Sequence, residues 1–369
     1  MSAPRYEIVR YEPEHKEALL DLQAHLWGSN RAADTAYFHW KYESNPYEKD
    51  PHIYLALSDG GVVGMRGVYG SMWEATPSAP TGKVLCAGDL VLQPKHRGRG
   101  LFTMIMEYAL ADLAHENVAY LFNLSAGVST RFGSLSTGWG STAPIPSMRR
   151  EKRPPKPGRA GGLLRRLGLS RPIAFTGPFG RIDHWSRRGG RVSRDILVSE
   201  ISRPDAMADL VRRTRHDGRI RHVRDESYFA WRFGNPRASY RFFFFGRNAL
   251  EGYLVLQTRL YAETPHPVRI VDCEATSQAA RSALLAAAVE GIENRALEIW
   301  TGTHSSGDRE ALGALGFEKQ DVSSVTEHYS SILVRPVLAS AQQRPWLFGG
   351  RDVLDLASWD VRLLDSDAS

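Results

Sequence analysis

Residues 89–110 read DLVLQPKHRGRGLFTMIMEYAL and change their hydrophobic period within one stretch. The apolar run from Leu90 to Leu92 ends before Pro94, and after Gly100 the apolar residues return at helical spacing. The stretch therefore predicts a strand, a glycine-rich turn and a helix. Such a turn directs free backbone N–H groups and a positive helix end at one point, which suits a phosphate. An ordinary connecting loop that happens to contain two glycines is the alternative.

The composition fits a globular protein of two domains. The chain has 369 residues, of which 42% are hydrophobic and 24% charged, and domains usually span about 100–200 residues. The two cysteines, Cys86 and Cys273, exclude a disulfide framework and fit a reducing compartment. The twelve histidines show no metal-ligand spacing, so no metal is expected. The start lacks a signal peptide, and no run approaches the roughly 18 apolar residues of a spanning helix, so we expect a cytoplasmic protein.

The positive charge of the chain is concentrated in one segment. Residues 149–194 hold fourteen Lys or Arg and two acids, a net charge of +12, whereas the whole chain carries +6. The segment is rich in Pro, Gly and Arg, which favours a linker or an insertion. Within it, GLLRRLGL at residues 162–169 is an apolar and basic pattern suited to an anionic membrane surface, with a solvated linker as the alternative. Nucleic acid is not favoured, because aromatic residues are sparse and no binding motif is present.

Residues 34–46 (DTAYFHWKYESNP) and residues 225–236 (DESYFAWRFGNP) are two copies of one motif. With a one-residue gap they share Asp, Tyr-Phe, Trp, a basic residue, an aromatic residue and Asn-Pro, at an offset of about 190 residues. After each copy, strand-like runs precede a helix and a further strand follows. The duplication predicts an α/β protein with two tandem units of mixed sheet.

The duplication also helps to distinguish residues that maintain the fold from residues that form a binding site. Large aromatic residues that occur in both motif copies are interpreted as core. The glycine-rich turn differs, because its counterpart, DCEATSQAAR at residues 272–281, contains no glycine. Only the first unit is therefore expected to bind a phosphate. The predicted organisation is a catalytic unit at 1–150, a basic linker or membrane-surface segment at 151–194, a degenerate unit at 195–335 and a C-terminal extension at 336–369.

The sequence at this point resembles the GNAT superfamily of CoA-dependent N-acyltransferases, and in particular members with two tandem units, one of them degenerate. LVLQPKHRGRGLF, residues 90–102, is similar to the family's pyrophosphate loop, with Arg97 and Gly100 in register. FNLSAGVSTRFGSLSTGWG, residues 122–140, is similar to the family segment with an Asn, a Ser and a terminal Gly-aromatic pair. The chain departs from the family at Phe102, where the loop usually ends in a small residue, and at Ser134, where a tyrosine often stands.

The resemblance implies acetyl-CoA or a longer acyl-CoA as cosubstrate and an amine as acceptor. The expected acyl-CoA contacts are Leu90, Leu92, Arg97, Gly98, Arg99, Gly100, Leu101 and Phe102, with Asn123 and Ser129 along the pantetheine arm. In this fold two strands splay apart and leave backbone donors for the oxyanion, here around Leu90 to Leu92. The chemistry also needs a base for the acceptor ammonium, and Asp89 is the best placed carboxylate, with a strand-edge or turn partner as its alternative role. A hydroxyl such as that of Ser134, at the usual tyrosine position, or of Ser136 could assist the leaving thiolate through a held water, although the thiolate could also leave unaided or take its proton from another group.

These observations predict an acyl-CoA-dependent N-acyltransferase that acts on a primary amine. The small and polar residues at 125–141 and the basic segment favour a membrane-lipid amine such as a sphingoid long-chain base, and hence lipid metabolism. An amino sugar or other small amine of polysaccharide or natural-product biosynthesis is the close alternative. A non-catalytic CoA-binding scaffold is a third reading, because the usual tyrosine is missing. The protein is expected in the cytoplasm, with peripheral contact to the inner face of the membrane as an extension of the basic-segment hypothesis.

Overall fold

The computed structural model describes most of the chain in thirteen stretches. They are residues 5–28, 30–75, 82–116, 118–124, 126–152, 195–214, 217–246, 249–261, 266–292, 295–302, 304–320, 330–337 and 346–366. The basic segment from residue 153 to residue 194 lies outside the described residues, so its predicted role at a membrane stays a prediction.

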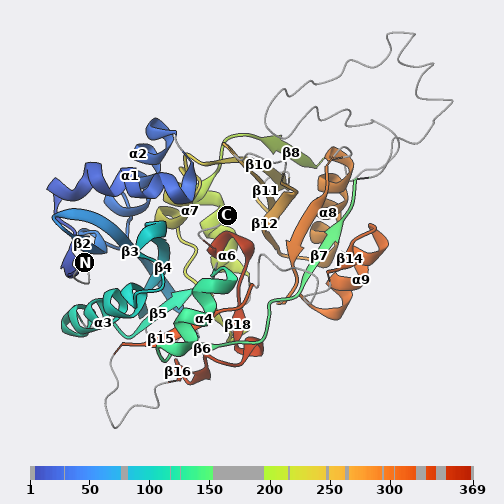
Figure 1. Ribbon diagram of the computed structural model, residues 1–369. Helices are drawn as coiled ribbons and strands as arrows, with labels where there is room; N and C mark the ends of the chain where they lie inside the picture. The colour runs from blue at the N-terminus through green and yellow to red at the C-terminus, as the bar shows by residue number, and fades with distance from the viewer. Residues whose placement is uncertain are drawn as a thin grey trace.

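The first half follows the predicted order of strands, turn and helix (Figure 1). Its elements are β1 (Glu7–Arg10), η1 (Pro13–His15), α1 (Lys16–Trp27), α2 (Arg31–Phe38), η2 (His39–Glu43), β2 (His52–Ser58), β3 (Gly61–Glu74), β4 (Gly82–Leu92), η3 (Pro94–His96), α3 (Leu101–Leu113), η4 (Ala114–Glu116), β5 (Tyr120–Asn123), α4 (Val128–Ser136), β6 (Gly140–Ser141) and β7 (Ser147–Arg150). The strand before the turn and the helix after it confirm the prediction made from residues 89–110.

The second half repeats this order without the glycine-rich turn. Its elements are β8 (Ile196–Ser199), α6 (Pro204–Arg213), β9 (Ile220–His222), α7 (Glu226–Arg232), β10 (Ala238–Phe245), β11 (Gly252–Arg259), β12 (Val268–Ala275), α8 (Gln278–Gly291), β13 (Leu297–Trp300), α9 (Ser306–Ala314) and β14 (Glu318–Lys319). The C-terminal part adds β15 (Leu333–Pro336), β16 (Leu347–Phe348), β17 (Arg351–Asp352), η6 (Leu356–Ser358), β18 (Trp359–Asp360) and η7 (Leu363–Asp365). Two tandem mixed α/β units are thus confirmed.

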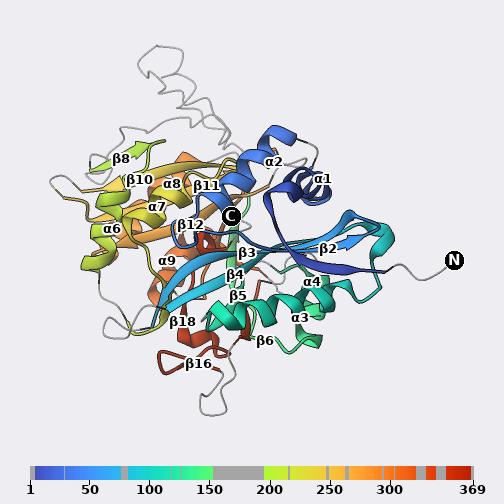
Figure 2. The same ribbon diagram turned by 90° about the vertical axis from the view of Figure 1, so that its left-hand side faces the viewer.

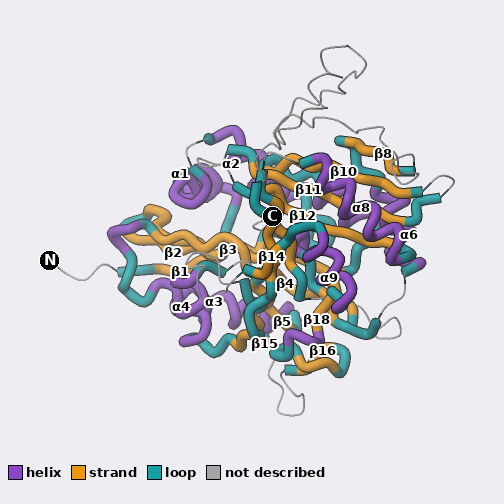
Figure 3. Tube along the Cα trace, turned by 90° about the vertical axis from the view of Figure 1, so that its right-hand side faces the viewer, coloured by secondary structure: helices purple, strands orange, loops and turns teal. Residues whose placement is uncertain are grey.

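Helices cover both faces of the first sheet, as Figures 2 and 3 show for α1 and α2 on one side and α3 on the other. The side chains of β4 alternate accordingly. Leu85 and Ala87 pack in the core with α3, whereas Val84 and Cys86 point into the opposite core with α1. A strand with both faces buried reads as an apolar run, which explains the lack of polar alternation in residues 84–92.

The two sheets exchange strands at their edges. Among the described residues, the first sheet runs β1-β2-β3-β4-β5-β15-β6, with β9 paired to β3 and β18 paired to β9 outside this order, and the second runs β14-β7-β13-β12-β11-β10-β8. Strand β7 therefore belongs to the second sheet, although it lies within the first predicted range, 1–150, and β15 returns to the first sheet between β5 and β6. Sheet membership does not follow the predicted sequence ranges, because the first half contributes β7 to the second sheet and the later part of the chain contributes β9, β15 and β18 to the first.

The duplicated motifs meet at a pseudo-symmetric contact between the halves. Trp40 and Trp231 stack at a ring-centroid distance of 4.9 Å and an interplanar angle of 9°. The indole N–H of Trp40 donates to the Trp231 carbonyl at 2.6 Å, and that of Trp231 donates to the Trp40 carbonyl at 2.7 Å. Tyr37 and Phe38 are buried, as are their counterparts Tyr228 and Phe229 in the second half. The interpretation of these shared aromatics as core is confirmed, and the tryptophans in addition join the halves.

Candidate active site

The turn between β4 and α3 presents an uncapped helix end to solvent. Gly98 and Gly100 have φ values of +71° and +76°, in the left-handed region that favours glycine, and nothing lies within 4 Å of a Cβ built on either residue. Gly100 is the N-cap of α3 and supplies no side-chain acceptor. The first amides of α3 therefore lack an intrahelical partner and face the turn. Arg97 is exposed, and its Nε donates to the Leu92 carbonyl at 3.1 Å, which holds the guanidinium over the end of β4.

The turn lies at the open end of a wedge between β4 and β5. These parallel strands are paired only at Leu85 with Leu121 and Cys86 with Phe122. Beyond Cys86, the edge of β4 that faces β5 has no strand partner in the described part of the chain, whereas its other edge stays paired to β3 as far as Leu92. The backbone of Leu90 and Leu92, both half-buried, thus borders a gap in the sheet.

A β-bulge in β4 shapes the middle of this wedge. Arg66 of β3 pairs with Leu90 and Val68 with Ala87, so Gly88 and Asp89 together oppose Gly67. Arg66 is buried and donates to the Gly88 carbonyl at 3.0 Å. The bulge redirects the backbone at the position where the sequence analysis placed the oxyanion donors.

Asp89 is buried in a network of three donors from α1 and η2. Its carboxylate accepts hydrogen bonds from Gln23 Nε2 at 3.1 Å, Lys41 Nζ at 3.0 Å and the Tyr42 hydroxyl at 2.9 Å. Only 1% of the Asp89 side chain and 2% of the Lys41 side chain are exposed. Gly67 is required for this arrangement, because a Cβ there would lie 2.0 Å from the Tyr42 hydroxyl oxygen. The geometry supports the structural role of Asp89 more directly than the role of base.

Sequence reasoning missed Gln23, Lys41, Tyr42 and Arg66. A signal for Lys41 was nevertheless present, because the duplicated aromatic motif keeps a basic residue at this position, Lys41 in one copy and Arg232 in the other. Both side chains are buried. A charge repeated inside a buried aromatic motif predicts a paired cation in the core.

The remaining predicted contacts lie around the wedge. Leu101 is buried at the start of α3, Asn123 is buried in β5, and Gly98, Arg99 and Gly100 are exposed. Ser129 belongs to α4, but its side chain lies outside the described residues. The Phe102 ring packs toward α4, where a Cβ on Gly133 would lie 3.3 Å from it, so the large side chain turns away from the loop. Ser134 is fully buried, and its hydroxyl donates to the Thr130 carbonyl at 2.8 Å within α4.

Residues 18–131 match the family model described as the acetyltransferase (GNAT) family. This match spans α1 to α4 and includes the turn, the bulge and the wedge. The first unit of the chain therefore matches the GNAT family. The family match supports a transferase, and the duplicated architecture is a tandem GNAT fold.

Solved GNAT structures share this fold over most of the chain. A conserved protein from Enterococcus faecalis V583, described as a probable N-acyltransferase, has a TM-score of 0.57 at 13% identity, covering 90% of this chain and 73% of its own. A GCN5-related N-acetyltransferase from Anabaena variabilis has a TM-score of 0.57 at 9% identity, with the same coverage. A tandem GNAT protein from the clavulanic acid biosynthesis pathway has a TM-score of 0.53 at 12% identity, covering 91% of this chain and 100% of its own. No curated protein matches the chain.

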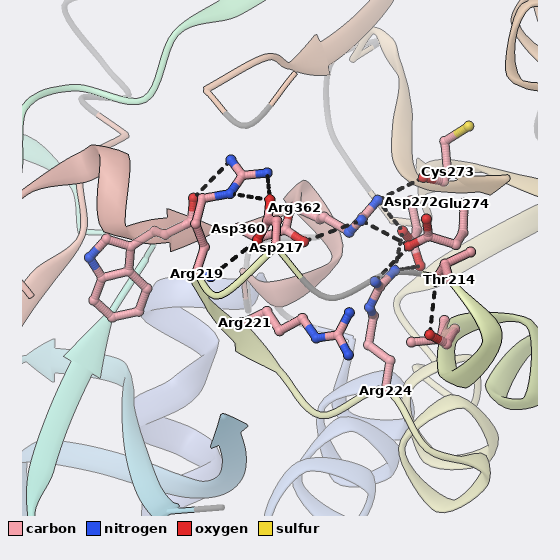
Figure 4. A network of polar contacts seen from close by, with 12 residues as sticks. Thr214, Asp217, Arg219, Arg221, Arg224, Asp272, Cys273, Glu274, Asp360 and Arg362 are labelled. Carbon is pink, nitrogen blue, oxygen red and sulfur yellow. Dashed lines mark hydrogen bonds and ion pairs between the residues drawn. The ribbon is translucent and has the colours of Figure 1, made fainter. Parts of the chain in front are cut away.

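The wedge of the second GNAT unit is occupied by the chain itself. Strands β12 and β13 are paired from Val268 with Leu297 to Ile270 with Ile299. Beyond this point Arg362, just before η7, donates to the Cys273 carbonyl at 2.7 Å and to Glu274 at 3.0 Å. Figure 4 shows its guanidinium between Asp360 on one side and Asp272 and Glu274 on the other. The degenerate unit thus holds a side chain of the C-terminal segment along the strand that corresponds to β4.

Within the described residues there is neither a cluster of metal ligands nor a membrane-spanning helix. No group of three or more His, Cys, Asp or Glu side chains there is arranged to hold a metal ion. Among the helices in those residues, none is long and apolar enough to cross a bilayer.

Proposed function

We propose that this tandem GNAT protein transfers an acyl group from acyl-CoA to a primary amine. The observation that carries the proposal is the exposed β4–α3 turn, in which two left-handed glycines and the uncapped start of α3 adjoin the unpaired edge of β4. Backbone N–H groups at a helix start bind phosphate, and the unpaired strand edge offers hydrogen bonds to the amides of a pantetheine arm. The equivalent turn of the second unit lacks glycine, so one acyl-CoA is expected per chain.

In this proposal the protein mainly positions the two reactants. Holding an amine beside a thioester converts a bimolecular step into an effectively unimolecular one. Backbone donors near Leu90 stabilise the oxyanion, and Arg97 pairs with the pyrophosphate. Asp89 as base and Ser134 as the residue that assists the thiolate remain proposals. The three donors on Asp89 and the bond from Ser134 to Thr130 favour structural roles for both.

The acceptor class is proposed as a membrane-lipid amine such as a long-chain base, with a small amine such as an amino sugar as the alternative. The basic segment supports a lipid surface, because each Lys or Arg near an anionic membrane contributes about 1 kcal/mol. Two apolar side chains on α4 add to this support. Phe132 is 70% exposed and Leu135 is 39% exposed, three residues apart beside the acyl-CoA turn.

A non-catalytic CoA-binding scaffold is the second candidate. It is favoured by Ser134, which replaces the usual tyrosine and whose hydroxyl proton is committed to a helix carbonyl. Turnover separates the two candidates, since both bind CoA and only the enzyme releases its thiol in the presence of an amine.

Calorimetric titration with acetyl-CoA, followed by a thiol-release assay with a panel of amines, tests the proposal. Gly100→Glu places a carboxylate at the phosphate position and should weaken binding by at least about tenfold, or ~1.4 kcal/mol. Gly100→Ala measures the cost of a side chain at φ +76° without the charge. Ala279→Glu, an exposed position in the first turn of α8, is the matched control in the second unit and should leave binding unchanged. Equal losses from Gly100→Glu and Ala279→Glu would contradict a site in the first unit.

A further inference from the structure

A small cavity lies between the two GNAT units, beneath the stacked tryptophans. Its lining, which includes Cys86, comes from both units and from the C-terminal segment, and its polar side chains include Lys41, Ser71, His222, Arg232 and Asp365. The cavity has a volume of about 10 Å³, which is space for one water molecule. Leu364 and Asp365 of η7 bring the C-terminal segment to this junction.

The cavity adjoins the narrow end of the first unit's wedge. Cys86 is the last residue of β4 that pairs with β5, so the wedge opens immediately beyond it. Lys41 lines the cavity and also binds Asp89 at the bulge. Lys41 of η2 therefore links the cavity to the bulge, whereas the acyl-CoA turn lies at the open end of the wedge beyond Leu92. An acceptor amine that meets a thioester at the bulge would place its nitrogen next to this cavity.

The charged groups around the cavity can be accounted for one by one. Lys41 is paired with Asp89. Burial lowers the pKa of His222 to about 3, so its ring is neutral at pH 7, and Nδ1 donates to the Val223 carbonyl at 2.8 Å. Arg232 donates to the Leu364 and Ser366 carbonyls at 2.8 and 2.6 Å. Among the described residues that line the cavity, Asp365 is the one carboxylate.

Asp365 is held in place by few contacts. Its Oδ2 accepts the Arg362 backbone N–H at 2.8 Å, and its Oδ1 lies 3.5 Å from the Tyr228 hydroxyl. Burial raises the pKa of Asp365 to about 7, against the opposing effect of the Arg362 N–H. The titratable and charged groups that face it are Lys41 of η2, Cys86 of β4, His222 of β9, Tyr228 and Arg232 of α7 and the side chain of Arg362, with Arg224 and Asp272 acting from farther away. A base is most effective when its pKa lies near the working pH.

We propose that Asp365 accepts the proton of the acceptor ammonium, directly or through a water molecule bound in the cavity. This inference rests on the proposed transfer to an amine. The ammonium passes one proton to Asp365, and the neutral nitrogen attacks the thioester carbon. The C–N bond forms as the C–S bond breaks, and the second nitrogen proton ends on the CoA thiolate. The products are the amide, CoA thiol and a protonated Asp365, which returns its proton to solvent.

Comparison of the two units supports Asp365 over Asp89. Asp272 of β12 also follows a bulge, where Val271 is the extra residue, and it accepts the Tyr253 hydroxyl at 2.7 Å and Arg224 at 3.1 Å. A buried aspartate with a tyrosine and a cation thus occurs in both units, including the one without a glycine turn. Asp365 has no such counterpart, because the C-terminal segment occurs once.

The test compares Asp365→Asn and Asp89→Asn with the wild type in thiol-release assays between pH 5.5 and about 9.5. Asparagine at 365 can still accept the Arg362 N–H, so we expect a folded variant with unchanged acetyl-CoA binding. Its rate at pH 7 should fall by about 10²–10⁴. The rate of the wild type should rise with pH around pH 7, because Asp365 loses its proton there. This ascending limb of the pH–rate profile should be missing in Asp365→Asn, whose rate should recover only at a pH at which the amine itself loses its proton. Asp89→Asn should keep the limb.

A stability measurement reports the same group without turnover. The pKa of Asp365 is raised above its usual value of 3.8, so the native state retains a proton that the unfolded chain loses between about pH 4 and pH 7. Stability of the wild type relative to Asp365→Asn should therefore fall as pH rises through this window. If Asp365→Asn does not fold, Asp365→Glu should retain the limb with a shifted midpoint, and an unchanged midpoint would overturn the proposal.

The outcomes separate the two proposals. A wild type that binds acetyl-CoA but acylates no amine of the panel overturns the proposed function, and the role of Asp365 with it. A wild type that turns over, with an Asp365→Asn variant of equal rate and equal pH profile, overturns the role of Asp365 alone.

Discussion

Removal of Lys41 should destabilise the first GNAT unit more than any surface change. Lys41→Met keeps the length of the side chain but leaves the Asp89 carboxylate, 1% exposed, without its cation. Breaking a buried ion pair from one side costs about 3–5 kcal/mol. Gln23 and Tyr42 still donate to Asp89, so we expect the lower end, about 3 kcal/mol. At about 2–4 °C per kcal/mol this lowers Tm by roughly 6–12 °C.

The assay is urea unfolding followed by circular dichroism, with thermal melts as a second readout. Lys16→Met is the control, because Lys16 pairs with Glu43 at 2.5 Å while both side chains are about 30% exposed, and such pairs contribute about 0–1 kcal/mol. In Lys41→Met/Asp89→Asn both charges are gone, so its loss should be smaller than the sum of the single losses by about 0.5–3 kcal/mol. A loss below 1 kcal/mol for Lys41→Met, or strict additivity in the double variant, would refute the reasoning.

Two further predictions concern the C-terminal and basic segments. Arg362→Met removes the donor to Glu274 and to the rest of its buried carboxylate cluster, so the free energy of unfolding of the second unit should fall by about 3–5 kcal/mol. Limited proteolysis should then cut the C-terminal segment earlier, and an unchanged cleavage pattern would show that this side chain does not hold the segment. Reversal of Arg165, Arg166 and Arg171 to Glu should reduce partitioning onto anionic vesicles, with an effect that shrinks as salt rises, because exposed charges are screened within about 10 Å at 0.1 M. A wild type that ignores anionic vesicles at low salt would end the membrane hypothesis.

The sequence predicted the elements of the fold because their patterns are local. The strand, turn and helix at residues 89–110, and the repeated order around each motif copy, depend on neighbours within a few turns of chain. The exchange of β7 and β15 could not be predicted in this way. Each of these strands is four residues long, and its partner is chosen by pairing across more than 140 residues, from Ser147 to Trp300 and from Asn123 to Leu333.

The candidate site was predictable in its exposed part only. The turn carries glycines with positive φ and arginines, which have recognisable chemistry in sequence. The environment of Asp89 depends on Gln23 and Lys41, which lie 66 and 48 residues away along the chain. No sequence pattern indicated a role for Asp365, because neither its burial nor its place between the two units follows from the residues beside it.

The duplication also bears on the hypothesis that only the first unit binds acyl-CoA while both units keep the fold. Both units retain a bulged strand with a buried aspartate behind the wedge, so this pair serves the architecture. In the second unit the wedge strand binds Arg362 from the same chain, which is always present and needs no phosphate turn to hold it. Three residues after Arg362, the same segment brings Asp365 into the cavity beside the first unit's wedge. Under the two proposals made above, a segment anchored in the wedge of the degenerate unit places a carboxylate near the wedge of the other, and the second unit would take part in the reaction in this way.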